Sequence, residues 1–304
     1  MRLPKILRVI LFSILALVGL CALIVGGLWL YFHPDYQRTT GIVYGHRNGK
    51  ELIMEAVRPS NPNGLGIVLL VSGGWRSGTN AFKPWMAASL LRRGYTILAL
   101  THISQPESTV SEIAQDMHRG IRYIRSHAND FGIDPARIGV TGGSAGGHLA
   151  LLLATRGGPG SSEAKDPVDR ESSSVQAVAI FYPVTDLLNL GKSRENPGDG
   201  GPPKSFVQAF GPGATNMPEW KVIGRDLSPI YFVRTNQPPV LIYHGDADTL
   251  LPLEQSEWFQ AKARELGATV EIVVHPGGEH GWPTMVFDIR HFADWFDKYL
   301  NPGK

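Results

Sequence analysis

The stretch from Gly139 to His148 reads Gly-Val-Thr-Gly-Gly-Ser-Ala-Gly-Gly-His, and it sets Ser144 among five glycines. An apolar run typical of a buried strand precedes it, and an apolar run typical of a helix follows it. Gly-x-Ser-x-Gly in a sharp strand-to-helix turn is the setting of a nucleophilic serine. Side chains at Gly142 and Gly146 would collide with the neighbouring strand and helix. This stretch therefore predicts Ser144 as a nucleophile at a helix amino terminus, where negative charge is favoured.

Two other interpretations of this turn are a serine without function and a phosphate-binding loop. A Walker-type loop requires Gly-Lys-Ser or Gly-Lys-Thr, and a dinucleotide loop requires G-x-G-x-x-G near a first strand. Neither pattern matches residues 139–148. The nucleophile is therefore the favoured interpretation.

The remainder of the chain after residue 36 alternates short apolar runs with amphipathic stretches. The apolar runs predict buried strands at Ile67–Val71, Tyr95–Leu100, Arg137–Val140, Val175–Phe181, Val240–Tyr243 and Thr269–Val274. The stretches between them predict helices at Phe82–Arg93, Val110–His127, Gly147–Thr155, Leu253–Leu266 and Thr284–Leu300. Such alternation predicts an α/β fold with a mostly parallel sheet covered by helices on both faces.

Before the first predicted strand, Asn48-Gly49 predicts a tight hairpin turn, because both residues tolerate positive φ. Two segments interrupt the alternation. We expect 157–174 to be a surface loop and 187–227 to be a partial lid, with Lys204–Phe210 as a short helical turn. No long linker divides the chain, so residues 36–304 are expected to form one domain.

The amino terminus has the composition of a membrane segment. Val9–Phe32 contains no charged residue, and three basic residues precede it. About 20 apolar residues span a bilayer, whereas a signal peptide has an apolar core of about 7–15 residues. We therefore expect residues 1–35 to be a retained anchor that contacts the membrane through residues 9–32, with the following domain extracytoplasmic. A cleaved signal, or one lipidated at Cys21, is the alternative.

Charge and cysteine content argue against nucleic-acid binding, a disulfide framework and a metal site. The formal net charge is +2, with 29 Lys and Arg against 27 Asp and Glu, so a nucleic-acid partner is not expected. The one cysteine allows no intrachain disulfide, and neither metal-ligand spacing nor a His-Glu-x-x-His pattern is present.

A nucleophilic serine requires a base and an orienting acid. His280 is the best candidate base because it follows the last predicted strand in a glycine-rich loop. Asp246 and Asp248 both follow the preceding strand. We expect Asp248, deeper in the turn, to orient His280, and Asp246 to brace the turn through backbone N–H groups. The other downstream histidines are expected to be structural, among them His148, which should pack or hydrogen-bond at the start of its helix.

Negative charge on the substrate oxygen requires donors. The N–H of Ala145, directly after the nucleophile, is one candidate. The second is expected in the glycine-rich loop after the strand Ile67–Val71, from Gly73, Gly74 or Trp75. The alternative for this loop is an ordinary turn.

Most of residues 40–300 resemble the α/β-hydrolase fold, and within it the carboxylesterase group with hormone-sensitive-lipase-like enzymes and bacterial feruloyl and acetyl esterases. The motifs that carry the resemblance are Asp116–Ala150, Phe181–Asp186, His244–Pro252 and Gly278–Gly281. In this resemblance Ser144, Asp248 and His280 match the catalytic triad, and Asp186 follows a family pattern outside it. That group usually shows His-Gly-Gly-Gly-Trp at the oxyanion loop. Here Val71 replaces the histidine that steadies the loop.

The residues and the resemblance together predict a serine hydrolase that cleaves small or polymer-linked carboxylic esters without a cofactor. Peptide or amide hydrolysis of the prolyl-oligopeptidase type is one alternative, although the chain before Ser144 is too short for a propeller domain. A catalytically silent binding module is the other.

Overall fold

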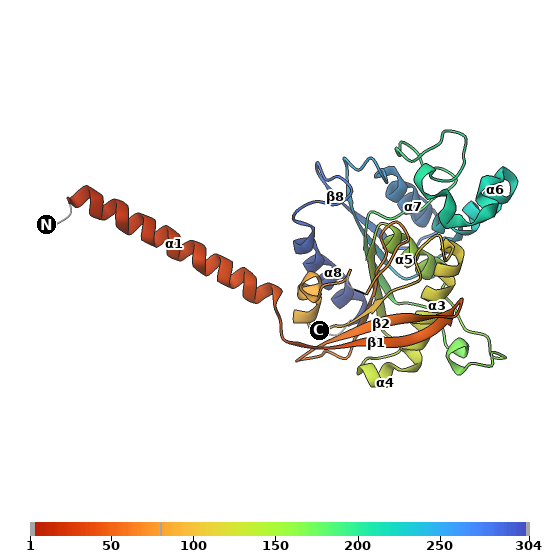
Figure 1. The fold of residues 1–304 in the computed structure, drawn as a ribbon, viewed down its shortest axis with the longest axis horizontal. Helices are drawn as coiled ribbons and strands as arrows, with labels where there is room; N and C mark the ends of the chain where they lie inside the picture. Colours follow the sequence, from red (N-terminus) through yellow and green to blue (C-terminus); the bar gives the residue numbers. More distant parts are fainter. Residues whose placement is uncertain (1–3, 80, 302–304) are drawn as a thin grey trace.

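The fold is built on one eight-stranded sheet (Figure 1). The computed structural model describes residues 4–79 and 81–301. The strands are β1 (Tyr36–Arg47), β2 (Lys50–Pro59), β3 (Gly66–Leu70), β4 (Thr96–Leu100), β5 (Ile138–Gly143), β6 (Ala177–Phe181), β7 (Val240–Gly245) and β8 (Val270–His275). They lie in the order β1-β2-β4-β3-β5-β6-β7-β8.

From β4 to β8 every neighbouring pair of strands is parallel, and only β1 and β2 run against their neighbours. The central strands β4 and β6 are buried at every residue. Strands covered on both faces have continuous apolar sequences rather than alternating ones, which is why the sequence predicts them. The carboxyl ends of β3, β5, β7 and β8 therefore meet at one edge of the sheet.

Helices cover both faces of the sheet. The helical elements that follow the hairpin are η1 (Pro84–Ala87), α2 (Ala88–Arg92), α3 (Val110–Ser126), α4 (Ala128–Phe131), α5 (Ala145–Arg156), η2 (Pro167–Arg170), η3 (Lys204–Phe210), η4 (Pro212–Thr215), α6 (Met217–Asp226), η5 (Pro229–Phe232), α7 (Glu254–Glu265) and α8 (Met285–Leu300). One hydrophobic core contains side chains of α3, α5 and α7, and the other contains side chains of α2 and α8. The predicted α/β fold class is confirmed.

The hairpin between β1 and β2 turns at Asn48 and Gly49, whose φ angles are 53° and 76°. Positive φ at both positions matches the right-handed twist of the flanking strands. The predicted hairpin is confirmed.

Two sequence predictions are corrected. The single helix expected over Phe82–Arg93 is instead a 3-10 turn, η1, followed by the five-residue α2. Its start is delayed because Lys83 before Pro84 is extended, with φ −120° and ψ 125°.

The segment 187–227, expected to lack core elements, contains α6, whose Trp220 is fully buried beside Phe210. The short turn expected at 204–210 is present as η3.

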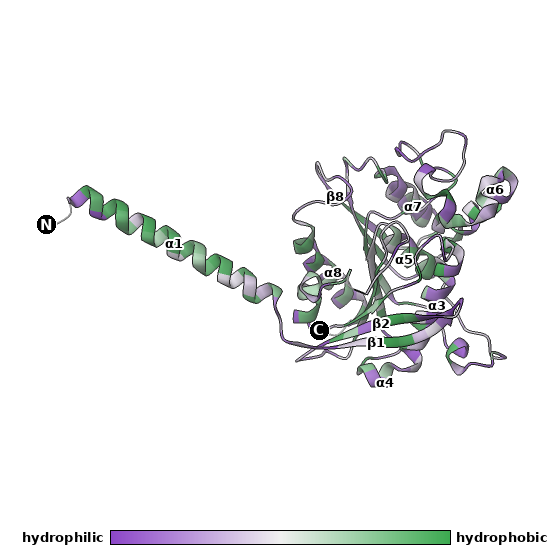
Figure 2. Ribbon diagram, viewed as in Figure 1, coloured by the Kyte–Doolittle hydropathy of each residue, from purple (hydrophilic) through white to green (hydrophobic). Residues whose placement is uncertain are grey.

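The helix α1 (Lys5–Phe32) extends away from this domain (Figure 1). Figure 2 colours most of the α1 ribbon as hydrophobic, whereas hydrophilic and hydrophobic residues alternate over the domain. None of its residues is buried, and within the described chain it is the one helix long and apolar enough to cross a membrane.

Candidate active site

Ser144 lies in the turn between β5 and α5 with φ 55° and ψ −121°. A non-glycine residue at positive φ is strained, and such strain gathers at functional sites. A Cβ on Gly142 would lie 2.7 Å from the carbonyl carbon of Gly146, and a Cβ on Gly146 would lie 2.5 Å from the carbonyl oxygen of Leu70. The collisions predicted from the sequence are therefore present on both sides of the serine.

Gly146→Ala is expected to destabilise the protein by about 1–3 kcal/mol, because β3 or α5 must shift to admit the methyl group. Thermal unfolding of the full chain in detergent measures this loss. Gly158→Ala is the matched control, since a Cβ there meets nothing within 4 Å. An unchanged unfolding midpoint in Gly146→Ala would contradict the close approach of the strand and helix.

His280, in the loop after β8, lies against Ser144, and Asp248, in the loop after β7, lies against His280. His280 Nε2 lies 3.0 Å from Ser144 Oγ, and His280 Nδ1 lies 2.7 Å from Asp248 Oδ2. An ionised carboxylate only accepts hydrogen bonds. Nδ1 therefore carries the proton, which leaves Nε2 free to accept the serine hydroxyl hydrogen. The three residues predicted from the sequence are brought together in the order Ser–His–Asp.

Asp248 is buried, and both of its carboxylate oxygens accept hydrogen bonds. Its Oδ1 accepts from the backbone N–H groups of Leu250 and Leu251, both at 2.9 Å. Burial by itself raises the pKa of Asp248, but the neighbouring His244 and His280 and the N–H of Leu251 outweigh it and hold the pKa below its ordinary value. The carboxylate therefore stays ionised across the pH range in which an imidazole can act as a base.

Asp246 braces the loop that carries His280. Its Oδ1 accepts from the backbone N–H of Gly277 at 2.6 Å, and the N–H of Ala247 donates to the carbonyl of Gly278 at 2.9 Å. These bonds join the loop after β7 to the loop after β8. They agree with the bracing role expected for Asp246.

His148 links the oxyanion loop to the segment after α6. Its Nδ1 accepts from Trp75 Nε1 at 3.2 Å, and its Nε2 donates to the carbonyl of Leu227 at 2.7 Å. Complete burial lowers the pKa of His148 to about 4. The imidazole is therefore neutral at pH 7, and its expected packing role at the start of α5 is confirmed.

This burial predicts a pH-dependent stability. The unfolded histidine titrates near 6.5 and the folded one near 4. Between these values the unfolded state binds more protons, so stability falls as the pH falls. From pH 7 to pH 5 we expect His148 to account for a loss of about 2 kcal/mol. Denaturant unfolding of wild type and His148→Gln at pH 7 and pH 5 measures this loss of stability. Equal pH dependence of the two proteins would contradict a neutral buried His148.

Val71 replaces the histidine that usually steadies the oxyanion loop in the family. Three other interactions hold the loop in this protein. His102 Nε2 lies 2.8 Å from Ser72 Oγ, and the N–H of Gly146 donates to the carbonyl of Ser72 at 3.1 Å. The hydroxyl of Ser77 donates to the carbonyl of Val71. The loop is therefore tied both to the turn that carries Ser144 and to the segment after β4. No pattern in the sequence indicates the part played by His102.

The predicted oxyanion donors differ in whether their N–H group is already hydrogen-bonded within the protein. The N–H of Gly73 donates to the carbonyl of Arg76 at 2.9 Å within the loop, which corrects the expectation that Gly73 is a donor to substrate. Gly74 follows with φ 55°, and its N–H makes no hydrogen bond to another described residue. Ala145 is the first residue of α5, so its N–H lacks a partner within the helix.

An apolar cavity of about 510 Å³ begins at Ser144 and His280. Its walls come from β3 and β4, from η1 and α2, and from α8. The apolar side chains that line it include Leu69, Phe82, Met86, Leu90, Met285 and Ile289. Phe206 of η3 also lines it, which places the segment 187–227 at the cavity. A cavity of this size and character suits an apolar group of a small ligand.

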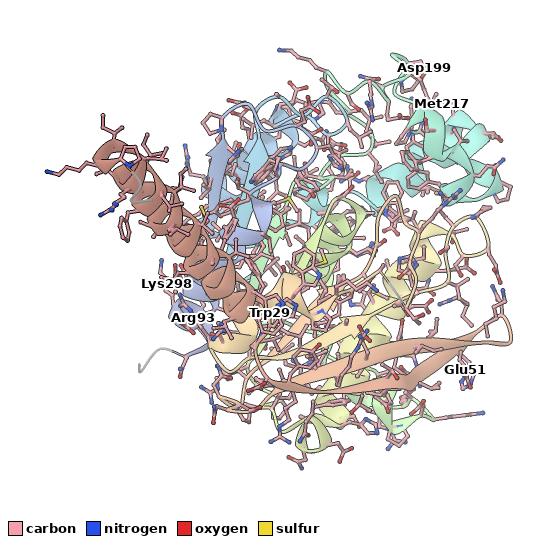
Figure 3. The ribbon with its side chains drawn as sticks, turned by 60° about the vertical axis from the view of Figure 1, so that its left-hand side comes forward. Trp29, Glu51, Arg93, Asp199, Met217 and Lys298 are labelled. Carbon is pink, nitrogen blue, oxygen red and sulfur yellow. The ribbon has the colours of Figure 1, made fainter. Side chains whose placement is uncertain are left out.

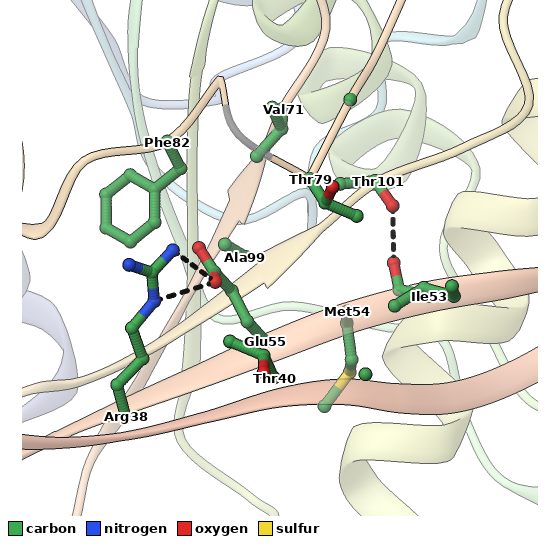
Figure 4. Close-up of a pocket in the computed structure, with 12 residues that line it drawn as sticks. Arg38, Thr40, Ile53, Met54, Glu55, Val71, Thr79, Phe82, Ala99 and Thr101 are labelled. Atoms are coloured by element: carbon green, nitrogen blue, oxygen red, sulfur yellow. Dashed lines mark hydrogen bonds and ion pairs between the residues drawn. The ribbon is translucent and has the colours of Figure 1, made fainter.

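Phe82 also lines a second cavity, of about 320 Å³, next to the first strands (Figure 4). Figure 4 shows Arg38 and Glu55 paired at its edge, with both Nε and Nη2 of Arg38 donating to Glu55 Oε2 at 2.9 and 2.6 Å. This cavity contains no Ser144, His280 or Asp248 atom in its wall. We therefore take the first cavity as the one that serves the serine.

The sheet, the strained serine and its two partners define an α/β-hydrolase fold with a candidate serine nucleophile. The chain belongs to the BD-FAE family, whose model matches residues 57–263.

Known relatives agree with this class. The chain is 29% identical over 263 residues to the esterase LipQ of Mycobacterium tuberculosis, covering 82% of this chain and 59% of LipQ. It is 27% identical over 257 residues to the isoprenylcysteine alpha-carbonyl methylesterase ICME of Arabidopsis thaliana, covering 82% of this chain and 58% of ICME. The chain thus spans less than two thirds of the length of these relatives.

Solved structures are similar over more of their length. A truncated carbohydrate esterase from gut microbiota superposes with a TM-score of 0.70 at 25% identity, covering 87% of this chain and 98% of that one. The propionate-bound esterase 2 of Thermogutta terrifontis superposes with a TM-score of 0.67 at 25% identity, covering 89% and 97%. The resemblance to an esterase group expected from the sequence is confirmed.

Proposed function

We propose that this protein hydrolyses carboxylic esters through a covalent acyl-enzyme formed on Ser144. The observation that carries the proposal is the continuous hydrogen-bonded series from Ser144 through His280 to Asp248 at the end of an apolar cavity. The esterase names of its relatives support the same chemistry.

In the first half of the reaction Ser144 Oγ attacks the ester carbonyl while His280 Nε2 takes its proton. The positive charge that forms on His280 is stabilised by the ionised Asp248. The N–H groups of Gly74 and Ala145 donate to the oxygen that becomes negative. His280 then gives the proton to the leaving alcohol, and the acyl group remains bound to Ser144.

In the second half His280 removes a proton from a water molecule, which attacks the acyl carbon. Collapse of this intermediate returns the proton to Ser144 Oγ and releases the acid. Apart from the ester and one water molecule, all groups used in the two halves belong to the chain. The apolar cavity receives the acyl chain, and Phe206 is the contact through which 187–227 acts as a partial lid.

We also propose that α1 is retained as a single-pass anchor with the domain on the extracytoplasmic side. Its length and the absence of charged residues from Val9 to Phe32 support the span, and the basic residues before Val9 support the orientation. A cleaved signal would instead yield a protein whose intact mass lacks residues 1–35.

The ester proposal is tested by comparing p-nitrophenyl butyrate with the p-nitroanilide of butyric acid, using the full chain in detergent. The two substrates share an acyl group and differ in the bond that is cleaved. We expect turnover of the ester and no measurable turnover of the anilide. Comparable kcat/KM values for both would favour the amide-hydrolase alternative, and a folded protein active on neither would favour the silent module.

A further inference from the structure

The end of α1 is docked on the domain by specific contacts. The Phe32 ring packs edge-on against Trp85 of η1, with centroids 6.2 Å apart, and against Phe287 of α8, with centroids 5.4 Å apart. Arg92 Nε donates to the carbonyl of Tyr31 at 2.7 Å, and its guanidinium lies 5.3 Å from the centre of the Tyr31 ring. The last turn of α1 is therefore fixed against η1, α2 and α8.

These contacts set the height of η1 and α8 relative to a bilayer. Tryptophan and tyrosine gather at the membrane–water interface, and the last turn of α1 carries Trp29 and Tyr31, followed by Phe32. Figure 3 shows Trp29 where α1 meets the domain. If α1 spans the membrane, the parts of η1 and α8 that touch Phe32 lie at the bilayer surface.

The domain presents large apolar side chains at this height. Trp85, Met86 and Phe287 are 44%, 40% and 41% exposed. We call these three residues the collar. Exposed apolar side chains that adjoin a membrane-spanning helix are suited to contact lipid rather than water.

The collar is continuous with the wall of the active-site cavity. Met86 belongs to both. On α8, Met285 and Ile289 line the cavity, while Phe287 lies on another face of the same helical turn, against Phe32. Met86 therefore joins the collar, which touches the end of α1, to the cavity that ends at Ser144.

We infer that the substrate is an ester dissolved in the bilayer, whose long acyl chain leaves the lipid along the collar and enters the cavity. This inference rests on the proposed esterase function and on retention of α1 as an anchor. The alcohol side of the ester stays on the aqueous side, where the leaving group departs. A short soluble ester reaches Ser144 directly from water and does not need the collar.

The test uses the full chain in phosphatidylcholine vesicles with two substrates, soluble p-nitrophenyl butyrate and vesicle-incorporated p-nitrophenyl palmitate. The variant is Trp85→Gln with Phe287→Gln, two residues outside the cavity wall. Val222→Gln is the control, because Val222 is 70% exposed on α6. We expect the collar variant to lose at least about tenfold on the palmitate and to stay within about twofold on the butyrate. The control should match wild type on both.

Other results overturn the inference. Equal losses on the two esters would indicate a structural effect, and no loss on either would show that the collar is not used. Wild type active on butyrate but not on vesicle-held palmitate would also overturn it while leaving the esterase proposal intact. Inactivity on both esters would instead remove the proposed function.

A second measurement does not depend on activity or on the double variant. In a Cys21→Ala background, spin labels are placed at Phe287→Cys and at Val222→Cys. In vesicles, the label at 287 is expected to collide more with oxygen than with a water-soluble nickel complex, and the label at 222 to show the reverse. Aqueous behaviour at both positions would overturn contact between the collar and lipid.

Discussion

Replacing Ser144 with alanine is expected to lower kcat for p-nitrophenyl butyrate by about 10⁶-fold. The alanine has no oxygen to attack the carbonyl, so only binding and oxyanion stabilisation remain. His280→Ala should cause a loss of similar size, because without Nε2 the serine keeps its proton. Members of a triad act as a unit, so the double variant should be about as slow as either single variant.

Steady-state kinetics of the purified full chain measure these losses, and thermal unfolding monitors the fold. The unfolding midpoint of each variant should stay near that of wild type. Ser162→Ala, an exposed serine in the loop 157–174, is the matched control and should keep full activity. Retained turnover in Ser144→Ala or His280→Ala would remove that residue from the mechanism.

The second large effect is expected for Asp248→Asn, with a loss of about 10⁴-fold in kcat. The amide oxygen can still accept from the N–H groups of Leu250 and Leu251, so the turn should persist. The amide nitrogen facing His280 would hold the imidazole in the wrong tautomer and would remove the negative charge beside it. Kinetics across the pH range should show a low rate throughout rather than a shifted optimum.

Asp246→Asn is the matched control because it removes one charge from the same turn. We expect a change of less than about tenfold, since Asp246 contacts the backbone of the His280 loop and not the imidazole. If Asp246→Asn were the more damaging substitution, the orienting role would belong to Asp246 and the assignment of Asp248 would be wrong.

The sequence predicts that these three residues meet because each lies at a strand end. Ser144, Asp248 and His280 follow β5, β7 and β8, whose carboxyl ends meet at one edge of a parallel sheet. Apolar runs locate the buried strands β5 and β7, and glycines mark the turns that follow them. The run at Thr269–Val274 also forms a strand, but β8 lies at the edge of the sheet and has no buried residue, which corrects the expectation of a buried strand there. The close approach of Gly146 to Leu70 is an example of a tertiary contact that is visible in the sequence as a glycine.

The sequence does not predict features that depend on tertiary packing. The burial of Trp220 makes α6 part of the core, although the residues around it resemble a polar loop. The interaction of His102 with Ser72 joins residues far apart in the sequence and has no local pattern. The hydrogen bond that occupies the Gly73 N–H depends on the exact path of its loop. None of these contacts leaves a periodic or spacing signal.

Trapping the acyl-enzyme shows directly whether Ser144 is the nucleophile. The full chain is mixed with p-nitrophenyl butyrate, quenched in acid within the first turnover, digested and analysed by mass spectrometry. We expect one butyryl group on the peptide that contains Ser144, and none in the Ser144→Ala variant. Continued ester turnover with no acyl group on Ser144 would contradict a covalent mechanism at this serine.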